Sequence, residues 1–242
     1  MRLDKELVNR ALARSRTLAQ KLINDGFVSV NGVVITKSSY DVLPRDTITV
    51  DDNDHIQYVS RAGHKLMGAL KIFSEVTAAD KNCLDAGAST GGFTDVLLQQ
   101  GAAHVAAVDV GHNQLVSTLR EDPRVSVYEG MNVRYLRPEH IGGVVDLTVS
   151  DLSFISLTLV MDALAQATRT GGDLLLMIKP QFEVGQHNIG RGGVVTDPIA
   201  HQEAIKKVSL SAQECGLNIA GVEKSPLPGQ DGNQEFFLWC TK

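Results

Sequence analysis

The chain has 242 residues, of which 43% are hydrophobic and 21% are charged, and its net charge is -5. This composition excludes a disordered protein and allows one large domain, or a large domain and a small one. The three isolated cysteines argue against a disulfide framework or a zinc site, and no apolar run reaches membrane-spanning length. We therefore expect a cytoplasmic protein with reduced thiols. The excess of acid argues, at first, against a nucleic-acid partner.

The charge is divided unevenly along the chain. Residues 1–37 contain seven basic and three acidic residues, whereas the remainder contains 16 basic and 25 acidic residues. A local excess of positive charge is typical of a segment that binds nucleic acid. The alternative is a solvated basic helix pair. The bases expected on these helices are Arg10, Arg14, Arg16 and Lys21.

The first 50 residues have the pattern of a small α+β domain. Apolar residues at helical spacing predict two short helices around 3–12 and 18–23. Ser15 is a candidate N-cap of the second helix, and Gly26 stands where a glycine would end it. Alternating apolar residues around Asn31-Gly32 predict a two-residue hairpin, and 47–50 predicts a further strand. The acidic run 51–54 is the expected linker.

After this linker the pattern changes to alternating strands and helices. Such alternation predicts a mostly parallel, doubly wound α/β sheet. Asp197-Pro198 should begin the last helix, and Gly216 should end it. The expected strands are 82–86, 104–109, 124–128, 144–150, 173–179, 217–223 and 235–240, and the expected helices are 61–74, 92–100, 113–120, 156–168 and 199–215.

A glycine-rich loop follows the first strand of this sheet, in the sequence CLDAGASTGGF (83–93). Glycines there let the backbone approach a ligand, and the following helix presents free N–H groups. Asp109 ends the next strand, 22 residues after Gly87, where a carboxylate can bind ribose hydroxyls. The loop and Asp109 together predict a nucleoside cofactor. A tight turn without a ligand is the alternative.

The residue Asp85 distinguishes between two cofactors. It stands two positions before the first glycine, where its charge would repel the pyrophosphate of NAD. The same carboxylate suits S-adenosylmethionine, which is cationic at sulfur and carries an ammonium group but no phosphate. We therefore favour S-adenosylmethionine, with NAD as the alternative.

The glycine loop resembles the cofactor loop of the FtsJ-like methyltransferases. Four further segments resemble the TlyA family, whose members are often named haemolysins and are known as ribosomal RNA 2′-O-methyltransferases. The opening of the chain is similar to that family's RNA-binding module, which a small-subunit ribosomal protein and many pseudouridine synthases share. The four segments are SRAGHKL (60–66), SDLSFISL (150–157), IKPQFE (178–183) and GNQEF (232–236), and the opening motifs are RLD (2–4), ARSR (13–16) and VNG (30–32).

This resemblance implies a Rossmann-like methyltransferase sheet of seven strands, with the last one antiparallel, in residues 60–242. A small α+β RNA-binding domain of the ribosomal-protein type would occupy residues 1–59. The implied activity is methyl transfer from S-adenosylmethionine to a ribose 2′-hydroxyl, expected to be that of a cytidine, in ribosomal RNA. The partner would be ribosomal RNA or a ribosomal subunit, with no membrane and no required protein partner.

The family's catalytic set falls on Lys65, Asp151, Lys179 and Glu235. Asp151 and Lys179 follow successive predicted strands, so both should lie at the carboxyl edge of the sheet. A 2′-hydroxyl must lose its proton, and a lysine whose pKa is lowered by burial and a second cation can accept it. We expect Lys179 to be this base, Asp151 and Glu235 to orient it, and Lys65 to position the ribose or stabilise the alkoxide. The alternatives are a surface position for Lys65, a solvated position for Glu235 and a helix cap for Asp151.

Further site residues follow from the resemblance. Asn132 and Val133 match the region that contacts adenine in the family, although an ordinary loop is the alternative. The glycine-containing stretch 183–197 predicts a mobile lid on the RNA side. The expected cofactor-binding residues are Asp85, Gly87, Ser89, Gly91, Gly92, Phe93, Asp109, Asn132, Val133 and Asp151, and the expected RNA-binding residues are Arg2, Arg10, Arg14, Arg16, Lys21, Arg61, His64 and Arg191, with His187 as a further candidate.

Two other functions compete with this interpretation. A membrane-lytic haemolysin would agree with the family's common name, but the sequence contains no export signal and no membrane-length apolar segment. A non-catalytic RNA-binding or ribosome-assembly factor would retain the fold without its chemistry. The complete Lys-Asp-Lys-Glu set argues against that second alternative.

Overall fold

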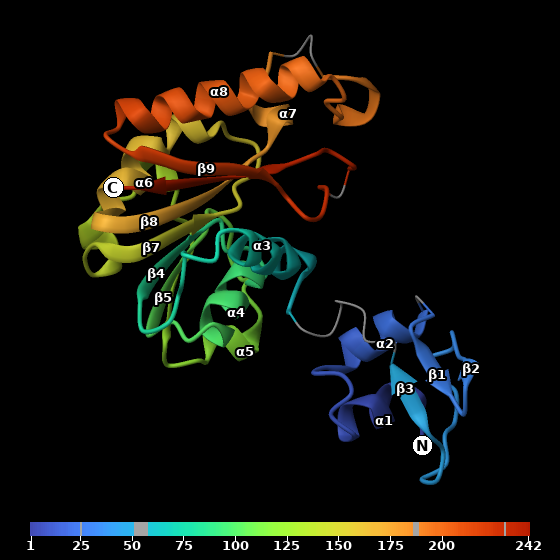
Figure 1. Cartoon of the computed structure of the whole chain (residues 1–242). Helices are drawn as coiled ribbons and strands as arrows, with labels where there is room; N and C mark the ends of the chain where they lie inside the picture. The colour runs from blue at the N-terminus through green and yellow to red at the C-terminus, as the bar shows by residue number, and fades with distance from the viewer. Residues whose placement is uncertain (25, 51–57, 186–188, 230) are drawn as a thin grey trace. The chain divides into compact units, whose positions relative to one another are not determined.

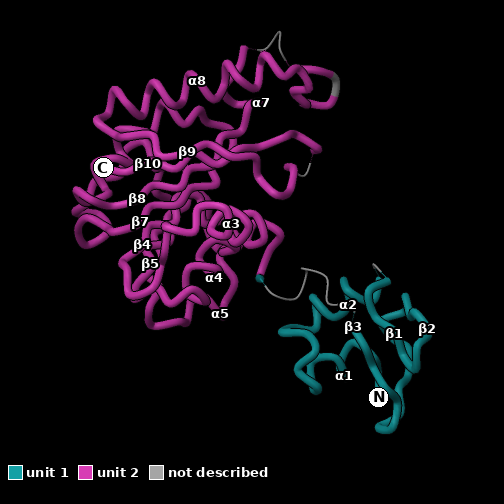
Figure 2. Tube along the Cα trace, viewed as in Figure 1, with its two compact units in different colours: residues 1–58 teal, residues 59–242 magenta. Residues whose placement is uncertain are grey.

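The computed structural model describes residues 1–24, 26–50, 58–185, 189–229 and 231–242. The chain forms two compact units, Met1–Tyr58 and Val59–Lys242, which are coloured separately in Figure 2. The expected acidic linker at 51–54 lies outside the described residues.

The first unit contains two helices and a small antiparallel sheet. The helices are α1 (Leu3–Asn9) and α2 (Arg16–Asn24), and the strands β1 (Val28–Val30), β2 (Val33–Val34) and β3 (Ile48–Val50) form a sheet in the order β2-β1-β3. Ser15 Oγ accepts the backbone N–H of Leu18 at 3.2 Å, as expected for the N-cap of α2. Asn31 and Gly32 have φ values of 51° and 82°, so the predicted hairpin forms with both central residues left-handed.

The second unit is built on a seven-stranded sheet in the order β6-β5-β4-β7-β8-β10-β9. The strands β4 to β8 are parallel, and β10 runs antiparallel to both β8 and β9. The predicted doubly wound sheet with an antiparallel last strand is therefore confirmed. The strands are β4 (Asn82–Ala86), β5 (His104–Val108), β6 (Val125–Tyr128), β7 (Val145–Ser150), β8 (Thr168–Ile178), β9 (Asn218–Lys224) and β10 (Phe236–Thr241).

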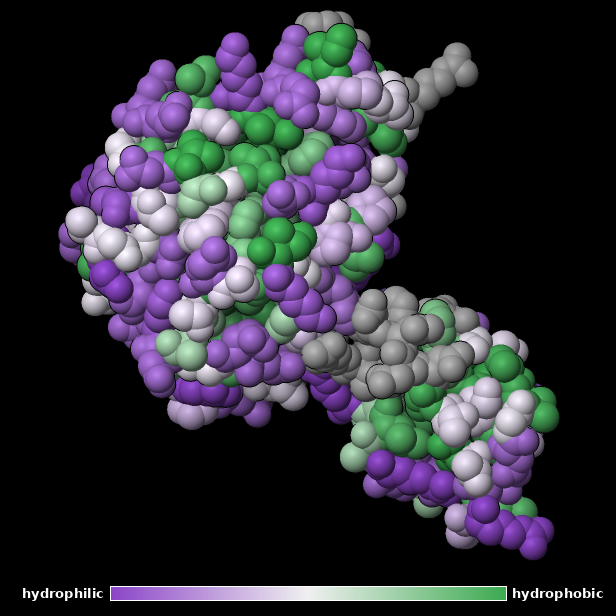
Figure 3. Space-filling model, viewed as in Figure 1, coloured by the Kyte–Doolittle hydropathy of each residue, from purple (hydrophilic) through white to green (hydrophobic). Residues whose placement is uncertain are grey.

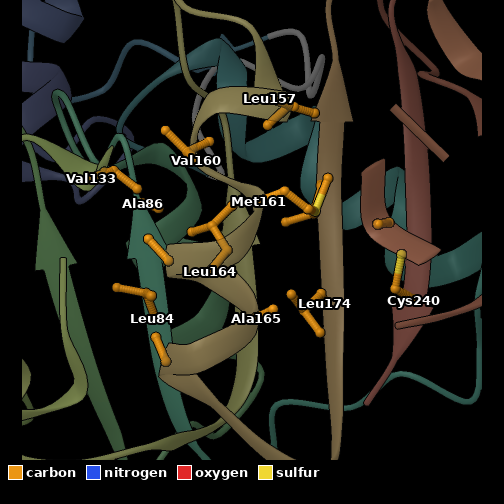
Figure 4. Close-up of a cluster of buried hydrophobic side chains, with 14 of the residues drawn as sticks. Leu84, Ala86, Val133, Leu157, Val160, Met161, Leu164, Ala165, Leu174 and Cys240 are labelled. Carbon is orange, nitrogen blue, oxygen red and sulfur yellow. The ribbon is translucent and has the colours of Figure 1, made fainter. Parts of the chain in front are cut away.

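Helices cover both faces of this sheet (Figure 1). One face carries α3 (Arg61–Ile72), α4 (Gly92–Gln99) and α5 (Ser117–Arg120), and the other carries α6 (Met161–Ala167) and α8 (Pro198–Glu214). Side chains alternate along each strand, so Leu84 of β4 and Leu174 of β8 pack in the buried cluster against α6 and α8 (Figure 4). Asp85 and Met177, at alternate positions of the same strands, face the opposite side, where they contact Thr94 of α4 and Lys65 of α3 respectively.

Some predicted elements differ from the observed ones because of local backbone geometry. The helix expected at 113–120 covers only α5, because Asn113 is left-handed and Val116 is extended. The helix expected at 156–168 divides into a 3₁₀ turn at Leu157–Leu159 and the helix α6. The strand β8 begins at Thr168, five residues earlier than expected, because Thr168 pairs with Val145 of β7; its buried hydroxyl also contacts that of Thr148 at 2.7 Å.

The surface is mixed in character. On the face of the molecule in Figure 3, hydrophilic and hydrophobic residues are interspersed, as is usual for folded proteins. Among the helices of the described residues, none has both the length and the apolar content that crossing a membrane requires.

Candidate active site

A cavity of about 660 Å³ lies at the carboxyl ends of β4, β7 and β8. This is the edge at which doubly wound sheets bind their ligands. All four members of the expected catalytic set line it, together with part of the glycine loop. The lining residues that concern the chemistry are Lys65, Gly87, Ser89, Gly92, Phe93, Asp151, Ser153, Phe154, Lys179, Gln181, Phe182 and Glu235.

The first pair of charged residues in this cavity joins the two ends of the second unit. Lys65 lies on α3 and Glu235 directly precedes β10, and Lys65 Nζ is 2.5 Å from Glu235 Oε2. Only 7% of Lys65 and 2% of Glu235 is exposed. The sequence alternatives of a surface lysine and a solvated glutamate are therefore wrong.

The second pair connects the ends of β7 and β8. Lys179 Nζ is 2.7 Å from Asp151 Oδ1, and it also donates a hydrogen bond to Ser153 Oγ at 2.8 Å. Asp151 does not cap the helix that follows, because Ser156 Oγ accepts the N–H of Thr158 instead. Parallel strand ends thus bring a lysine, a carboxylate and a hydroxyl together.

The pairing differs from the expectation in one respect. We expect both Asp151 and Glu235 to orient Lys179, but the structure pairs Glu235 with Lys65. The reason is topological, since β10 lies between β8 and β9 and the residue directly before it, Glu235, faces Lys65 of α3 across the cavity. Each buried lysine therefore has its own carboxylate, which compensates the cost of burying its charge.

The glycine loop has conformations that require glycine. Gly87 has a φ of 91°, and a Cβ atom there would lie 2.9 Å from the backbone oxygen of Asp151. A Cβ on Gly92 would lie 2.2 Å from Ser60 Oγ, so Gly92 lets α4 pack close to the start of α3. Gly91 is left-handed and lies against Leu119, outside the cavity lining. Gly91 and Gly92 are therefore needed for close packing between segments of the protein, whatever ligand the loop binds.

Asp85 is completely buried near the end of β4 and is not among the residues that line the cavity. Thr94 Oγ1 donates to its Oδ2 at 2.6 Å, whereas its Oδ1 has no hydrogen-bond partner among the described residues. Burial raises the pKa of Asp85 to about 7, and repulsion from Asp151 and Asp109 adds to this effect. A buried carboxylate oxygen without a partner is costly, and a cationic ligand group would satisfy it.

The expected adenosine-binding residues lie beside the loop but outside the cavity lining. Asp109 accepts the N–H of Ser89 at 2.8 Å and that of Gly111 at 2.7 Å, so its carboxylate shapes the loop. Asn132 Oδ1 accepts the N–H of Arg134 at 3.0 Å and begins a 3₁₀ turn, while Val133 is part of the core. The ordinary-loop reading therefore accounts for the Asn132 and Val133 contacts that the structure shows.

The basic residues of the first unit are partly engaged in internal ion pairs. Arg2 and Arg16 both contact the carboxylate of Asp4, which is fully buried, at 3.0 Å and 2.9 Å. Arg10 pairs with Glu6 at 2.8 Å. The side chains of Arg2 and Arg16 are still 41% and 51% exposed, so these arginines stabilise the helix pair and remain accessible to phosphate. Arg14 and Lys21 are exposed.

The other expected RNA contacts belong to the second unit. Arg61 is exposed at the cavity and donates to the backbone oxygen of Pro228 at 3.2 Å. His64 is half-buried on α3. Arg191 lies in a 3₁₀ turn at Arg191–Gly193, within the predicted lid, and His187 lies outside the described residues.

Ser153 and Phe154 are among the cavity residues that received no role from the sequence. Ser153 is the hydrogen-bond partner of Lys179, and its position two residues after Asp151 was the available signal. Phe154 is 92% exposed, has a φ of 63° and lies 5.4 Å from the ring of Phe182. An exposed aromatic ring with a left-handed backbone is unusual, and nothing in the sequence distinguishes it from a core phenylalanine.

Comparison with known proteins now identifies the family. The family described as FtsJ-like methyltransferase matches residues 58–242, and the S4 domain matches residues 1–48. The chain is 51% identical over 238 residues to the 16S/23S rRNA (cytidine-2'-O)-methyltransferase TlyA of Mycobacterium tuberculosis, covering 98% of this chain and 88% of the relative. The chain belongs to the TlyA family of FtsJ-like methyltransferases. The predicted family, fold and enzyme class are thereby confirmed.

Other proteins to which the chain is similar carry different names. The chain is 39% identical to Hemolysin A of Brachyspira hyodysenteriae, and the match covers 98% of both chains. A solved structure of a hemolysin-named protein from Streptococcus thermophilus superposes with a TM-score of 0.78 at 38% identity, covering 100% of this chain and 88% of that one. An S-adenosylmethionine-dependent methyltransferase from Listeria monocytogenes, at 15% identity and a TM-score of 0.55, shares the fold of the second unit.

Proposed function

We propose that this member of the TlyA family transfers a methyl group from S-adenosylmethionine to the 2′-hydroxyl of a cytidine in ribosomal RNA. The observation that carries the proposal is the pair of buried lysine–carboxylate contacts facing one cavity beside the glycine loop. The Mycobacterium tuberculosis and Campylobacter jejuni relatives are both named rRNA (cytidine-2'-O)-methyltransferases. An rRNA substrate also agrees with the expected cytoplasmic location.

The donor set of the site suits S-adenosylmethionine. The unpartnered Oδ1 of Asp85 would hold the ammonium group of its methionine moiety, and Asp109 would hold the ribose hydroxyls. The Gly87 backbone, on which no Cβ fits, would lie beside it. When bound, the cofactor supplies an electrophilic methyl group. Because it carries no pyrophosphate, it brings no phosphate charge near the carboxylates of Asp85, Asp109 and Asp151. A phosphate-bearing dinucleotide fits this acidic surrounding poorly.

The residues of the chain then divide the work on the acceptor. Lys179 Nζ, once it has released its own proton, takes the proton from the ribose O2′, and Asp151 and Ser153 hold Nζ in place. Lys65, fixed by Glu235, places its positive charge near the oxygen on which negative charge develops. Because each lysine is held by a different carboxylate, Lys179 and Lys65 can have different roles, the first as the base and the second as the electrostatic stabiliser.

Phe154 supports a nucleotide acceptor. Its ring lines the cavity, is 92% exposed and stands next to Phe182. Exposed aromatic rings bind the unstacked bases of single-stranded RNA by stacking. We propose that the base of the target nucleotide stacks on Phe154.

The decisive experiment is methyl transfer from labelled S-adenosylmethionine to purified ribosomal subunits and to naked ribosomal RNA, followed by mapping of ribose methylation. Comparing Lys179→Ala with Lys65→Ala over a range of pH identifies the base. We expect label in a ribose and a loss of activity in Lys179→Ala. No incorporation into any of these RNAs contradicts the proposal, and full activity of Lys179→Ala contradicts the role of Lys179.

The two alternative functions make different predictions. A non-catalytic assembly factor with a degenerate site would bind no S-adenosylmethionine in calorimetry. A membrane-lytic protein would release the contents of liposomes when purified without detergent. We expect cofactor binding and no leakage.

A further inference from the structure

Glu183 connects the two segments that carry the Lys179–Asp151 pair. It ends α7 (Pro180–Glu183), the short helix that begins directly after Lys179, and only 6% of the residue is exposed. Its Oε1 accepts the backbone N–H of Leu157 at 2.7 Å, and its Oε2 accepts from Ser156 Oγ at 2.5 Å. Ser156 and Leu157 end the loop that begins at Asp151. One carboxylate therefore joins the loop after β7 to the loop after β8.

The residues of α7 face two different parts of the protein, the cavity and the loop after β7. Gln181 and Phe182 line the cavity, whereas the Glu183 carboxylate contacts the loop behind it. Lys207 of α8 completes this contact, with Nζ 3.5 Å from Glu183 Oε2 and a hydrogen bond of 2.8 Å to the Glu183 backbone oxygen. Burial raises the pKa of Glu183, while Ser156, Leu157 and Lys207 favour its ionised form. Burial of a charged carboxylate is unfavourable, and the contacts of Glu183 with Ser156, Leu157 and Lys207 compensate for it. These contacts fix the position of the loop that precedes Leu157.

We infer that Glu183 is a positioning residue for methyl transfer, which holds the loop of Asp151 and Ser153 against Lys179 and so fixes Lys179 Nζ. The inference rests on the proposed function, in which Nζ takes the ribose proton. A general base must lie within about 2.6–3.2 Å of the oxygen it deprotonates. A displacement of about 1 Å, caused far from the chemistry, can cost on the order of 100-fold in rate.

The test compares wild type, Glu183→Ala and Glu183→Gln in single-turnover methyl transfer to purified ribosomal subunits. We expect Glu183→Ala to lower the rate constant about 10- to 100-fold, while the affinities for S-adenosylmethionine and subunits change less than about threefold. Glu183→Gln should recover most of the rate, because its amide can still accept from Leu157 and donate to Ser156 Oγ. Each rate constant is divided by the fraction of the protein that binds S-adenosylmethionine in calorimetry. If Glu183 only stabilises the fold, the normalised rate constant of Glu183→Ala equals that of wild type, and this result would overturn the inference.

A matched pair on α8 tests the same contact from its other side. Lys207→Met removes the ion pair and should lower the rate constant several-fold, whereas its exposed neighbour Lys206 has no part in the contact, so Lys206→Met should not. If Glu183→Ala does not fold, Ser156→Ala replaces it as the milder variant. Equal rates for Lys207→Met and Lys206→Met count against the inference.

A crystal structure of Glu183→Ala gives a result that does not depend on activity. We expect Lys179 Nζ to leave its place 2.7 Å from Asp151 Oδ1. An unchanged pair would overturn the inference even if wild type and Lys206→Met transfer no methyl group. Absence of transfer by those two proteins would instead contradict the proposed function.

Discussion

The carboxylate of Asp85 should destabilise the cofactor-free protein, and Asp85→Asn should reveal by how much. Burial raises the pKa of Asp85 from 3.8 to about 7. The folded state therefore binds this proton more tightly than the unfolded state. Proton binding by Asp85 therefore stabilises the folded state fully below pH 3.8. This stabilisation is lost as the pH rises through about 7, and the unfolding free energy no longer changes with this group at higher pH. The difference between these two pKa values, about 3, corresponds to roughly 4 kcal/mol of unfolding free energy.

Asparagine at position 85 has nearly the same shape but cannot ionise. The unfolding free energy of Asp85→Asn minus that of wild type should therefore increase by roughly 2 to 3 kcal/mol between pH 5 and pH 8. The same variant should bind S-adenosylmethionine more weakly at pH 8. Wild-type affinity should itself fall as pH drops below 7, because the protonated carboxyl no longer attracts an ammonium group.

Urea denaturation followed by fluorescence provides the assay. The single tryptophan, Trp239, lies in β10, so its emission reports the unfolding of the second unit. Asp80→Asn is the matched control, since Asp80 is an exposed carboxylate of the same unit. A stability difference between Asp85→Asn and wild type that does not vary with pH would refute the reasoning.

Three further substitutions test other features. Gly87→Ala should cost about 1–3 kcal/mol of stability, because its Cβ would lie 2.9 Å from the Asp151 backbone oxygen; Gly142→Ala, also left-handed but in open space, measures the backbone strain alone. Phe154→Ala should lower kcat/KM for ribosomal subunits about tenfold or more and leave cofactor affinity unchanged; a loss confined to cofactor binding would argue against stacking. Asp4→Asn should lower the stability of the first unit by about 1–2 kcal/mol, because it weakens the hydrogen bonds that two half-exposed arginines donate to their shared carboxylate; an unchanged thermal unfolding temperature would contradict this.

Features that depend on neighbouring residues could be predicted from the sequence. Strand β4 has the expected bounds, and the Asn31-Gly32 hairpin forms as predicted. Asp197 accepts the N–H of Ile199 at 2.9 Å and caps α8. Each of these rests on a local preference, such as a left-handed turn, a cap or an apolar run, which the surrounding fold does not override.

Features that depend on distant residues could not be predicted in the same way. The position of Glu235 at the cavity follows from its motif, but its pairing with Lys65 requires the sheet order. The contacts of Arg2 and Arg16 with Asp4 turn part of an expected RNA surface into an internal ion-pair cluster. Net charge and spacing carry no information about such pairings, because they arise only when separated segments meet.

The place of β10 in the sheet has a consequence for synthesis. This strand lies between β8 and β9, and the residue that leads into it, Glu235, pairs with Lys65 across 170 positions of sequence. While the chain is being made, α3 and the strands β4 to β8 leave the ribosome before the counter-charge of Lys65 has been synthesised, and the edge of β8 that later pairs with β10 is open. The enzyme can therefore gain its second ion pair only after the final strand has been inserted, so a chain cut before residue 235 should be both inactive and prone to aggregation.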